Sequence, residues 1–103
     1  MKRFHLALTV SDLDRSAAFY TRLFGAEPVV READYAKWIV EDPALNLSLS
    51  THGSVHGVDH VGLEADSDEG LAELREALVA AEGPLLDQPD VTCCYARSAK
   101  TWT

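Results

Sequence analysis

Two histidines stand at matching positions of two similar segments, and their residue type suits metal chemistry. His5 begins the run HLAL and His60 begins the run HVGL. Neutral imidazole is the commonest metal ligand in proteins. If the two segments lie side by side, both rings point at one place, and the sequence therefore predicts a shared metal site at His5 and His60. The alternative is a pair of ordinary strand histidines that are held only by hydrogen bonds.

The two cysteines of the chain, Cys93 and Cys94, are adjacent. Neighbouring α-carbons give poor geometry for a disulfide bond, so two free thiols are expected. Two interpretations stay open from these residues alone. The thiols are either buried and inert, as free cysteines often are, or a reactive pair whose function depends on the rest of the molecule.

The elements that would position these residues come from a weak internal repeat. FHLALTVSDLDRSAAFYTRLFGAEPVV and DHVGLEADSDEGLAELREALVAAEGPLL each contain an apolar run, a polar break, a helical pattern, a glycine and an extended run. The first helix is expected to start at Ser11, as the cap of Ser11-x-x-Asp14, and the second after Asp66 or Ser67 and to end at Gly83. Further strands are expected at residues 35–40, 45–50, 85–87, 92–97 and 100–103. The predicted order is βαβββ followed by βαββ and the start of another strand.

Side chains alternate between the two faces of a strand, which separates the histidines from the apolar positions. In the first segment Leu6, Leu8 and Val10 share one face, which suits a covering helix. His5 lies on the opposite face, and the same alternation puts His60 opposite its apolar neighbours. The residues two positions after the histidines are Ala7 and Gly62, which leave room beside each ring. This face is predicted to line a cavity.

Composition limits the classes of function. A chain of 103 residues with 47% hydrophobic residues fits a single domain with a small hydrophobic core. Formation of a homodimer would bury more apolar surface. The net charge of −8 argues against nucleic-acid and anionic-membrane partners. Because neither a membrane-spanning run nor a secretory signal is recognisable, a cytoplasmic protein is expected. Thiols are kept reduced in that compartment.

These residues resemble a known family. Paired βαβββ modules with a histidine in each first strand, together with HLALTVSDLDRSAAFYTRLFGAEPV, resemble the vicinal oxygen chelate superfamily, which includes glyoxalase I, extradiol dioxygenases and bleomycin-resistance proteins. DVTCCYARSAKTWT, with HLALTVSDL and DHVGLEADS, is similar to the iron-dependent organoarsenical lyases, also called cadmium-induced proteins. The resemblance implies an α+β fold in one domain, residues 1–103. Module 1 would span about residues 1–54, and module 2 about residues 55–103, with its final strands beyond Thr103.

The resemblance also implies roles for individual residues. His5 and His60 match the family's metal histidines, and Cys93 and Cys94 match the pair that captures trivalent organoarsenicals. The third ligand in such enzymes is a glutamate on the last strand, so a carboxylate is expected beyond Thr103. Two histidines and one carboxylate leave open positions on Fe(II) for oxygen and substrate. The implied activity is Fe(II)- and O2-dependent cleavage of the carbon–arsenic bond of methylarsenite or aromatic arsenicals, which releases arsenite and detoxifies the arsenical.

Three other functions stay open. A non-catalytic protein could bind a thiophilic metal or metalloid through Cys93 and Cys94. A glyoxalase-like or ring-cleaving enzyme of the same superfamily would use the histidines but leave the cysteines without a role, and a structural dimeric domain would use neither. Glu64 lies roughly 13 Å along the strand from His60, too far to share one metal ion, and is expected at the rim. His52 and His56 are expected to be exposed loop residues.

Overall fold

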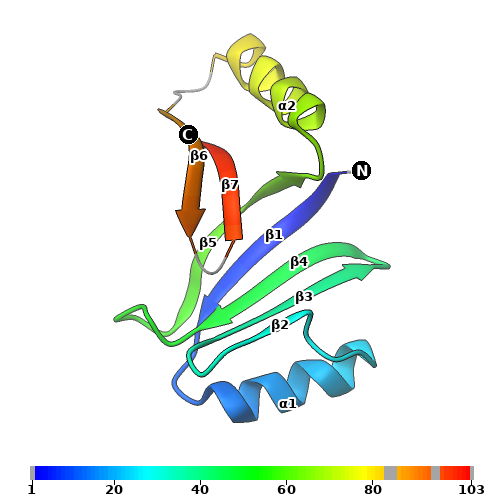
Figure 1. Cartoon of the computed structure of the whole chain (residues 1–103), viewed down its shortest axis with the longest axis vertical. Helices are drawn as coiled ribbons and strands as arrows, with labels where there is room; N and C mark the ends of the chain where they lie inside the picture. Colours follow the sequence, from blue (N-terminus) through cyan, green and yellow to red (C-terminus); the bar gives the residue numbers. More distant parts are fainter. Residues whose placement is uncertain (1, 83–85, 94–95, 103) are drawn as a thin grey trace. The chain divides into compact units, whose positions relative to one another are not determined.

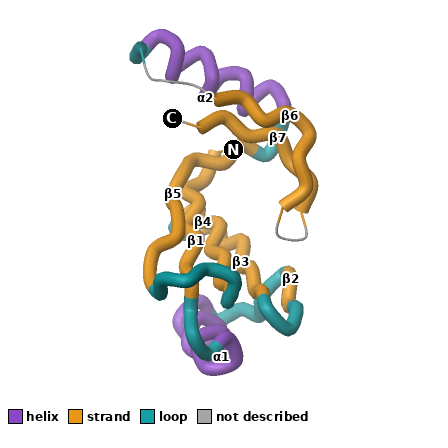
Figure 2. The backbone as a smooth tube through the Cα atoms, turned by 90° about the vertical axis from the view of Figure 1, so that its left-hand side faces the viewer, coloured by secondary structure: helices purple, strands orange, loops and turns teal. Residues whose placement is uncertain are grey.

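The computed structural model describes residues 2–82, 86–93 and 96–102, the last two ranges by their backbone (Figures 1 and 2). The strands are β1 (Lys2–Thr9), β2 (Val30–Arg31), β3 (Tyr35–Glu41), β4 (Ala44–Ser50), β5 (Gly57–Ala65), β6 (Leu86–Cys93) and β7 (Ala96–Trp102), and the helices are α1 (Leu13–Phe24) and α2 (Asp68–Ala80). The fold is therefore α+β, and the order βαβββ followed by βαββ is confirmed. The further strand expected to start at residue 100 is wrong, because residues 100–102 continue β7. The chain forms two compact units, Lys2–Glu64 and Ala65–Thr103. A boundary between repeat modules near residue 54 stays a prediction.

The first unit is built on a five-stranded sheet in the order β2-β3-β4-β1-β5. β1 pairs in parallel with β4, and β4 pairs antiparallel with β3. As Figure 1 shows, α1 lies along one face of this sheet. The order places β1 and β5, the two strands that carry the histidines, next to each other. The first strands of the two repeated segments are thus neighbours in the sheet.

The apolar face of the sheet packs on α1 and forms the core. Its buried members come from α1, β3 and β4: Leu13, Ala17, Ala36, Trp38, Leu47 and Leu49. Leu6, Leu8 and Val10 of the first segment pack against this cluster, as the alternation predicted. Trp38 is 1% exposed, and its indole Nε1 donates to the carbonyl oxygen of Ala26 at 3.1 Å. A buried partner for its polar atom allows this large side chain to anchor the core.

Helix α1 begins one residue later than the sequence pattern predicted. Asp12 is the N-cap, and its carboxylate accepts a hydrogen bond from the backbone nitrogen of Arg15 at 3.1 Å. Ser11 therefore precedes the cap, because the charged acceptor of Asp12 satisfies a free N–H of the first turn. The helix ends at Gly25, whose φ of 65° is left-handed and whose N–H bonds to the carbonyl of Thr21.

The second unit contains α2 and a hairpin. Ser67 caps α2 by accepting from the backbone nitrogen of Gly70 at 3.0 Å, as expected. The helix ends at Ala80, with Ala81 as its C-cap, and so before the predicted end at Gly83. β6 and β7 pair antiparallel, with Leu86 opposite Trp102 and Cys93 opposite Ala96. The prediction of one extended segment over residues 92–97 is therefore wrong. Thr92 and Arg97 face each other across the hairpin, because ladder hydrogen bonds between two longer strands satisfy more backbone groups.

Neither described helix is long and apolar enough to cross a lipid bilayer.

Candidate metal site

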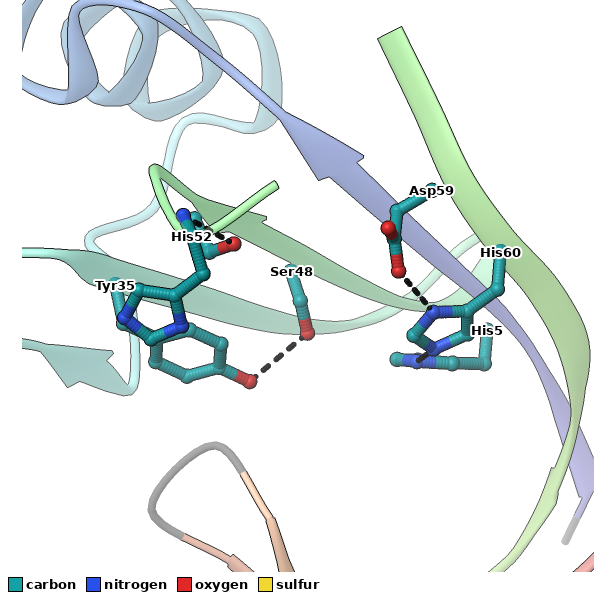
Figure 3. A network of polar contacts seen from close by, with 7 residues as sticks. His5, Tyr35, Ser48, His52, Asp59 and His60 are labelled. Carbon is teal, nitrogen blue, oxygen red and sulfur yellow. Dashed lines mark hydrogen bonds and ion pairs between the residues drawn. The ribbon is translucent and has the colours of Figure 1, made fainter. Parts of the chain in front are cut away.

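The two predicted histidines meet on the face of the sheet opposite α1. The Nε2 atoms of His5 and His60 are 3.1 Å apart, and the ring centroids are separated by 5.0 Å (Figure 3). His5 comes from β1 and His60 from β5, so the contact depends on the adjacency of these strands. The structure therefore brings the rings together as the repeat predicted. Their role as metal ligands stays a prediction.

The distance between the rings fits two ligands of one metal ion. Imidazole nitrogens bind ions such as zinc at about 2.1 Å, so two nitrogens 3.1 Å apart would subtend an angle of about 95° at a shared ion. Neighbouring positions of an octahedral site have nearly this angle. Without an ion, the same separation suits an N–H···N hydrogen bond. Among the described residues there is no group of three or more His, Cys, Asp or Glu side chains that could hold a metal.

Asp59 orients the ring of His60. Its Oδ2 lies 2.7 Å from Nδ1 of His60, as Figure 3 shows. With the proton on Nδ1 donated to this carboxylate, Nε2 presents its lone pair toward His5. A carboxylate on the far nitrogen of a metal-binding histidine is a common arrangement, which fixes the tautomer and makes the ring a stronger ligand. Asp59 was not singled out from the sequence, although its position directly before His60 was visible.

Burial keeps His5 in the form that a metal requires. The pKa of His5 lies below the ordinary value of 6.5, mainly because burial disfavours the charged ring, and secondly because His60 is close. Glu64 and Asn46 act in the opposite direction on this pKa, but more weakly. His5 is therefore neutral near pH 7, and a neutral imidazole is the species that binds a metal.

Buried polar side chains continue the histidine face onto the neighbouring strands. Asn46 and Ser48 of β4 lie opposite His5 and Ala7 in the parallel ladder. Ser48 bonds to the hydroxyl of Tyr35 at 3.0 Å (Figure 3). Thr9 of β1 is buried as well. The signal for Asn46 and Ser48 was present in the alternating run LNLSLS, but only the strand order shows that their face is also that of His5.

Glu64 belongs to this polar face and is half-buried, and its place at the rim of a metal site stays a prediction. Its Oε2 accepts a hydrogen bond from Nδ2 of Asn46 at 2.9 Å. This bond connects the carboxylate on β5 to the amide on β4. The other two histidines are exposed, as expected, and His52 pairs with Asp34.

Of the two cysteines, the structure places the backbone of Cys93 alone. Cys93 is the last residue of β6, and its side chain lies outside the described residues, as does the whole of Cys94. Their predicted role in substrate binding stays a prediction.

Comparison with known proteins assigns the chain to a family. Residues 2–100 match the Glyoxalase/Bleomycin resistance protein/Dioxygenase superfamily. A trivalent organoarsenical cleaving enzyme from Bacillus sp. (strain MD1) is 42% identical over 99% of this chain and 65% of its own length. The cadmium-induced protein CadI of Mycobacterium tuberculosis (strain H37Rv) is 37% identical over 99% of this chain and 68% of its own length. The chain thus spans about two thirds of the length of these relatives.

A solved structure supports the fold. The protein described as NAD-dependent benzaldehyde dehydrogenase from Legionella pneumophila superposes with a TM-score of 0.55 at 18% identity, covering 93% of this chain and 85% of that one. A likeness at this identity concerns the fold alone. Together with the sequence matches, it confirms the expected resemblance to the organoarsenical lyases and their vicinal oxygen chelate fold. The chain belongs to the glyoxalase/bleomycin resistance protein/dioxygenase superfamily.

Proposed function

We propose that this protein cleaves the carbon–arsenic bond of trivalent organoarsenicals, with His5 and His60 as ligands of Fe(II) and with O2 as the oxidant. The observation that carries the proposal is the convergence of the two Nε2 atoms to 3.1 Å, in a chain 42% identical to an enzyme named for this cleavage. When bound, Fe(II) supplies open coordination positions at which oxygen and substrate can meet. A carboxylate from beyond Thr103 is the proposed third ligand.

The described residues prepare the site for this ion. Burial keeps His5 neutral, and Asp59 accepts the Nδ1 proton of His60, so the Nε2 lone pair of His60 is available to an ion beside Nε2 of His5. The sheet fixes the two strands, and little rearrangement is needed when the ion binds. Such pre-organised ligands lower the cost of binding.

The adjacent cysteines are the proposed substrate ligands. Trivalent arsenic is thiophilic, and the thiolates of Cys93 and Cys94 would bind it. Capture by two thiolates would hold the substrate in one orientation, which accelerates such reactions strongly. The proposed setting is the cytoplasm, where both thiols stay reduced.

The test is turnover of methylarsenite or phenylarsenite by the full-length protein with Fe(II) in air, measured as released arsenite. Replacement of His5 or His60 by alanine should lower the rate more than about 100-fold, because each change removes a metal ligand. Cys93→Ser/Cys94→Ser should lower it comparably through lost capture of arsenic. His52→Ala is the matched control, since this histidine is exposed and pairs with Asp34, and it should keep the wild-type rate. Undiminished turnover by the double cysteine variant would refute the capture role.

A second candidate is a metalloid-binding protein without catalysis. It rests on the adjacent thiols of Cys93 and Cys94, because thiolates bind soft metal and metalloid ions. Stoichiometric binding of arsenite without oxygen consumption by the full-length protein would support it and contradict the first proposal.

A further inference from the structure

Two buried polar atoms beside the histidine pair have no hydrogen-bond partner among the described residues. They are Nδ1 of His5 and Oδ1 of Asn46. The two residues are direct register partners on the neighbouring strands β1 and β4. Nearly all buried polar groups in folded proteins are paired, so two unpaired atoms on adjacent residues call for a physical explanation.

The orientation of the Asn46 amide is set by Glu64. Nδ2 of Asn46 donates to Oε2 of Glu64 at 2.9 Å, and a carboxylate oxygen accepts hydrogen bonds from the amide nitrogen rather than from the amide oxygen. Oδ1 is therefore the free end of the amide, and it is an acceptor. Asn46 is 5% exposed, so bulk water does not supply a ready partner.

The positions of the protons on the two histidines indicate a role for Oδ1 of Asn46. A neutral imidazole that binds a metal through Nε2 carries its proton on Nδ1. His60 already has Asp59 to accept that proton. His5 needs an equivalent acceptor, and its register partner Asn46 has in Oδ1 a buried acceptor that is not yet paired. The present geometry falls short of a hydrogen bond at Nδ1.

We propose that Asn46 is a positioning residue for the metal site: its Oδ1 accepts the Nδ1 proton of His5 when Nε2 of His5 binds a metal, and Glu64 holds the amide in the required orientation. The inference rests on the proposed metal site of His5 and His60. Binding of the ion would thus pair both atoms that are unpaired without it. Asp59 would then accept the Nδ1 proton of His60 through its carboxylate, and Asn46 would accept that of His5 through its amide oxygen.

The experiment measures metal binding rather than turnover. Affinity for Co(II) and its visible absorption spectrum are recorded for the untagged full-length protein and for Asn46→Leu, which removes the acceptor at similar volume. Asn46→Leu should bind Co(II) about 10–100-fold more weakly, the usual effect of losing such a partner. Glu64→Gln keeps an oxygen that can accept from Nδ2 of Asn46 and should bind Co(II) within about fivefold of the wild type. Ser48→Ala, which alters the next buried polar position of the same face, should bind like the wild type.

A tautomer measurement provides an independent readout that does not depend on how Asn46→Leu folds. Long-range 1H–15N spectra of the wild-type protein loaded with Zn(II) should show the proton of His5 on Nδ1, in a resonance shifted by hydrogen bonding. A protonated Nε2 on His5 would overturn the proposal, and so would wild-type Co(II) affinity in Asn46→Leu.

The outcomes separate this inference from the proposed function. If Co(II) binding requires His5 and His60 but not Asn46, the positioning role fails and the metal site stands. If His5→Ala and His60→Ala bind Co(II) as tightly as the wild type, both the metal site and the role of Asn46 are wrong.

Discussion

At the scale of single residues, His5 shows how burial adapts an ordinary side chain to metal binding. Its pKa is lowered chiefly by burial and further by His60, while Glu64 and Asn46 compensate only in part. Asp59 fixes the proton of His60 at Nδ1. Burial thus favours the neutral form of His5, and Asp59 orients the ring of His60.

The lowered pKa of His5 predicts how stability depends on pH in the metal-free protein. The unfolded chain takes up a proton on this residue near pH 6.5, whereas the folded protein takes it up only at lower pH. Between these values the unfolded state binds more protons, so the free energy of unfolding should decrease as pH falls below about 6.5. Urea unfolding at pH 7.5 and 5.5 in the presence of a chelator measures this decrease.

In His5→Gln the free energy of unfolding should fall less between pH 7.5 and 5.5 than in the wild type. His56→Gln, which removes an exposed histidine, should show the wild-type fall. An equal pH dependence in His5→Gln and wild type would mean that His5 does not contribute.

At the scale of elements, one sheet face forms the core and the other forms the polar site. Trp38 and Leu47 pack toward α1, while Asn46 and Ser48, which alternate with them in the β3–β4 ladder, lie on the face of His5. Helix α1 thereby covers the apolar side and supports β4 and β3 beneath the site. A substitution that weakens α1 should therefore lower the free energy of unfolding of the first unit.

The cap of α1 offers a sharp test of its observed start. Asp12→Ala removes the acceptor for the backbone nitrogen of Arg15 and should lower the free energy of unfolding by about 1 kcal/mol. Ser11→Ala is the control, since Ser11 precedes the cap and its loss should cost less than about 0.5 kcal/mol. Thermal or urea unfolding distinguishes the two. A larger loss of stability in Ser11→Ala than in Asp12→Ala would instead support Ser11 as the cap, as the sequence pattern predicted.

At the scale of the whole molecule, the proposed metal connects β1 and β5, strands separated by most of the first unit in sequence but adjacent in the sheet. A ligand that binds only the folded state stabilises it by mass action, by about 2.7 kcal/mol at 100 times its dissociation constant. Metal loading should therefore raise the melting temperature in calorimetry, and a chelator should reverse the increase. His60→Ala should abolish it. A melting temperature that metal does not change in the wild type would contradict the site.

The amino-acid sequence by itself determined the order of elements, the faces of β1 and the two histidines, because strand alternation and an internal repeat are local patterns that survive without coordinates. It also placed the site in a family through motifs that span the chain. Only the tertiary structure decided that Asn46 of β4 lies beside His5 and that Glu64 holds its amide, because strand order and register are set by packing between distant segments. The start of α1 was decided in the same way, by which neighbouring acceptor reaches the free N–H of the first turn.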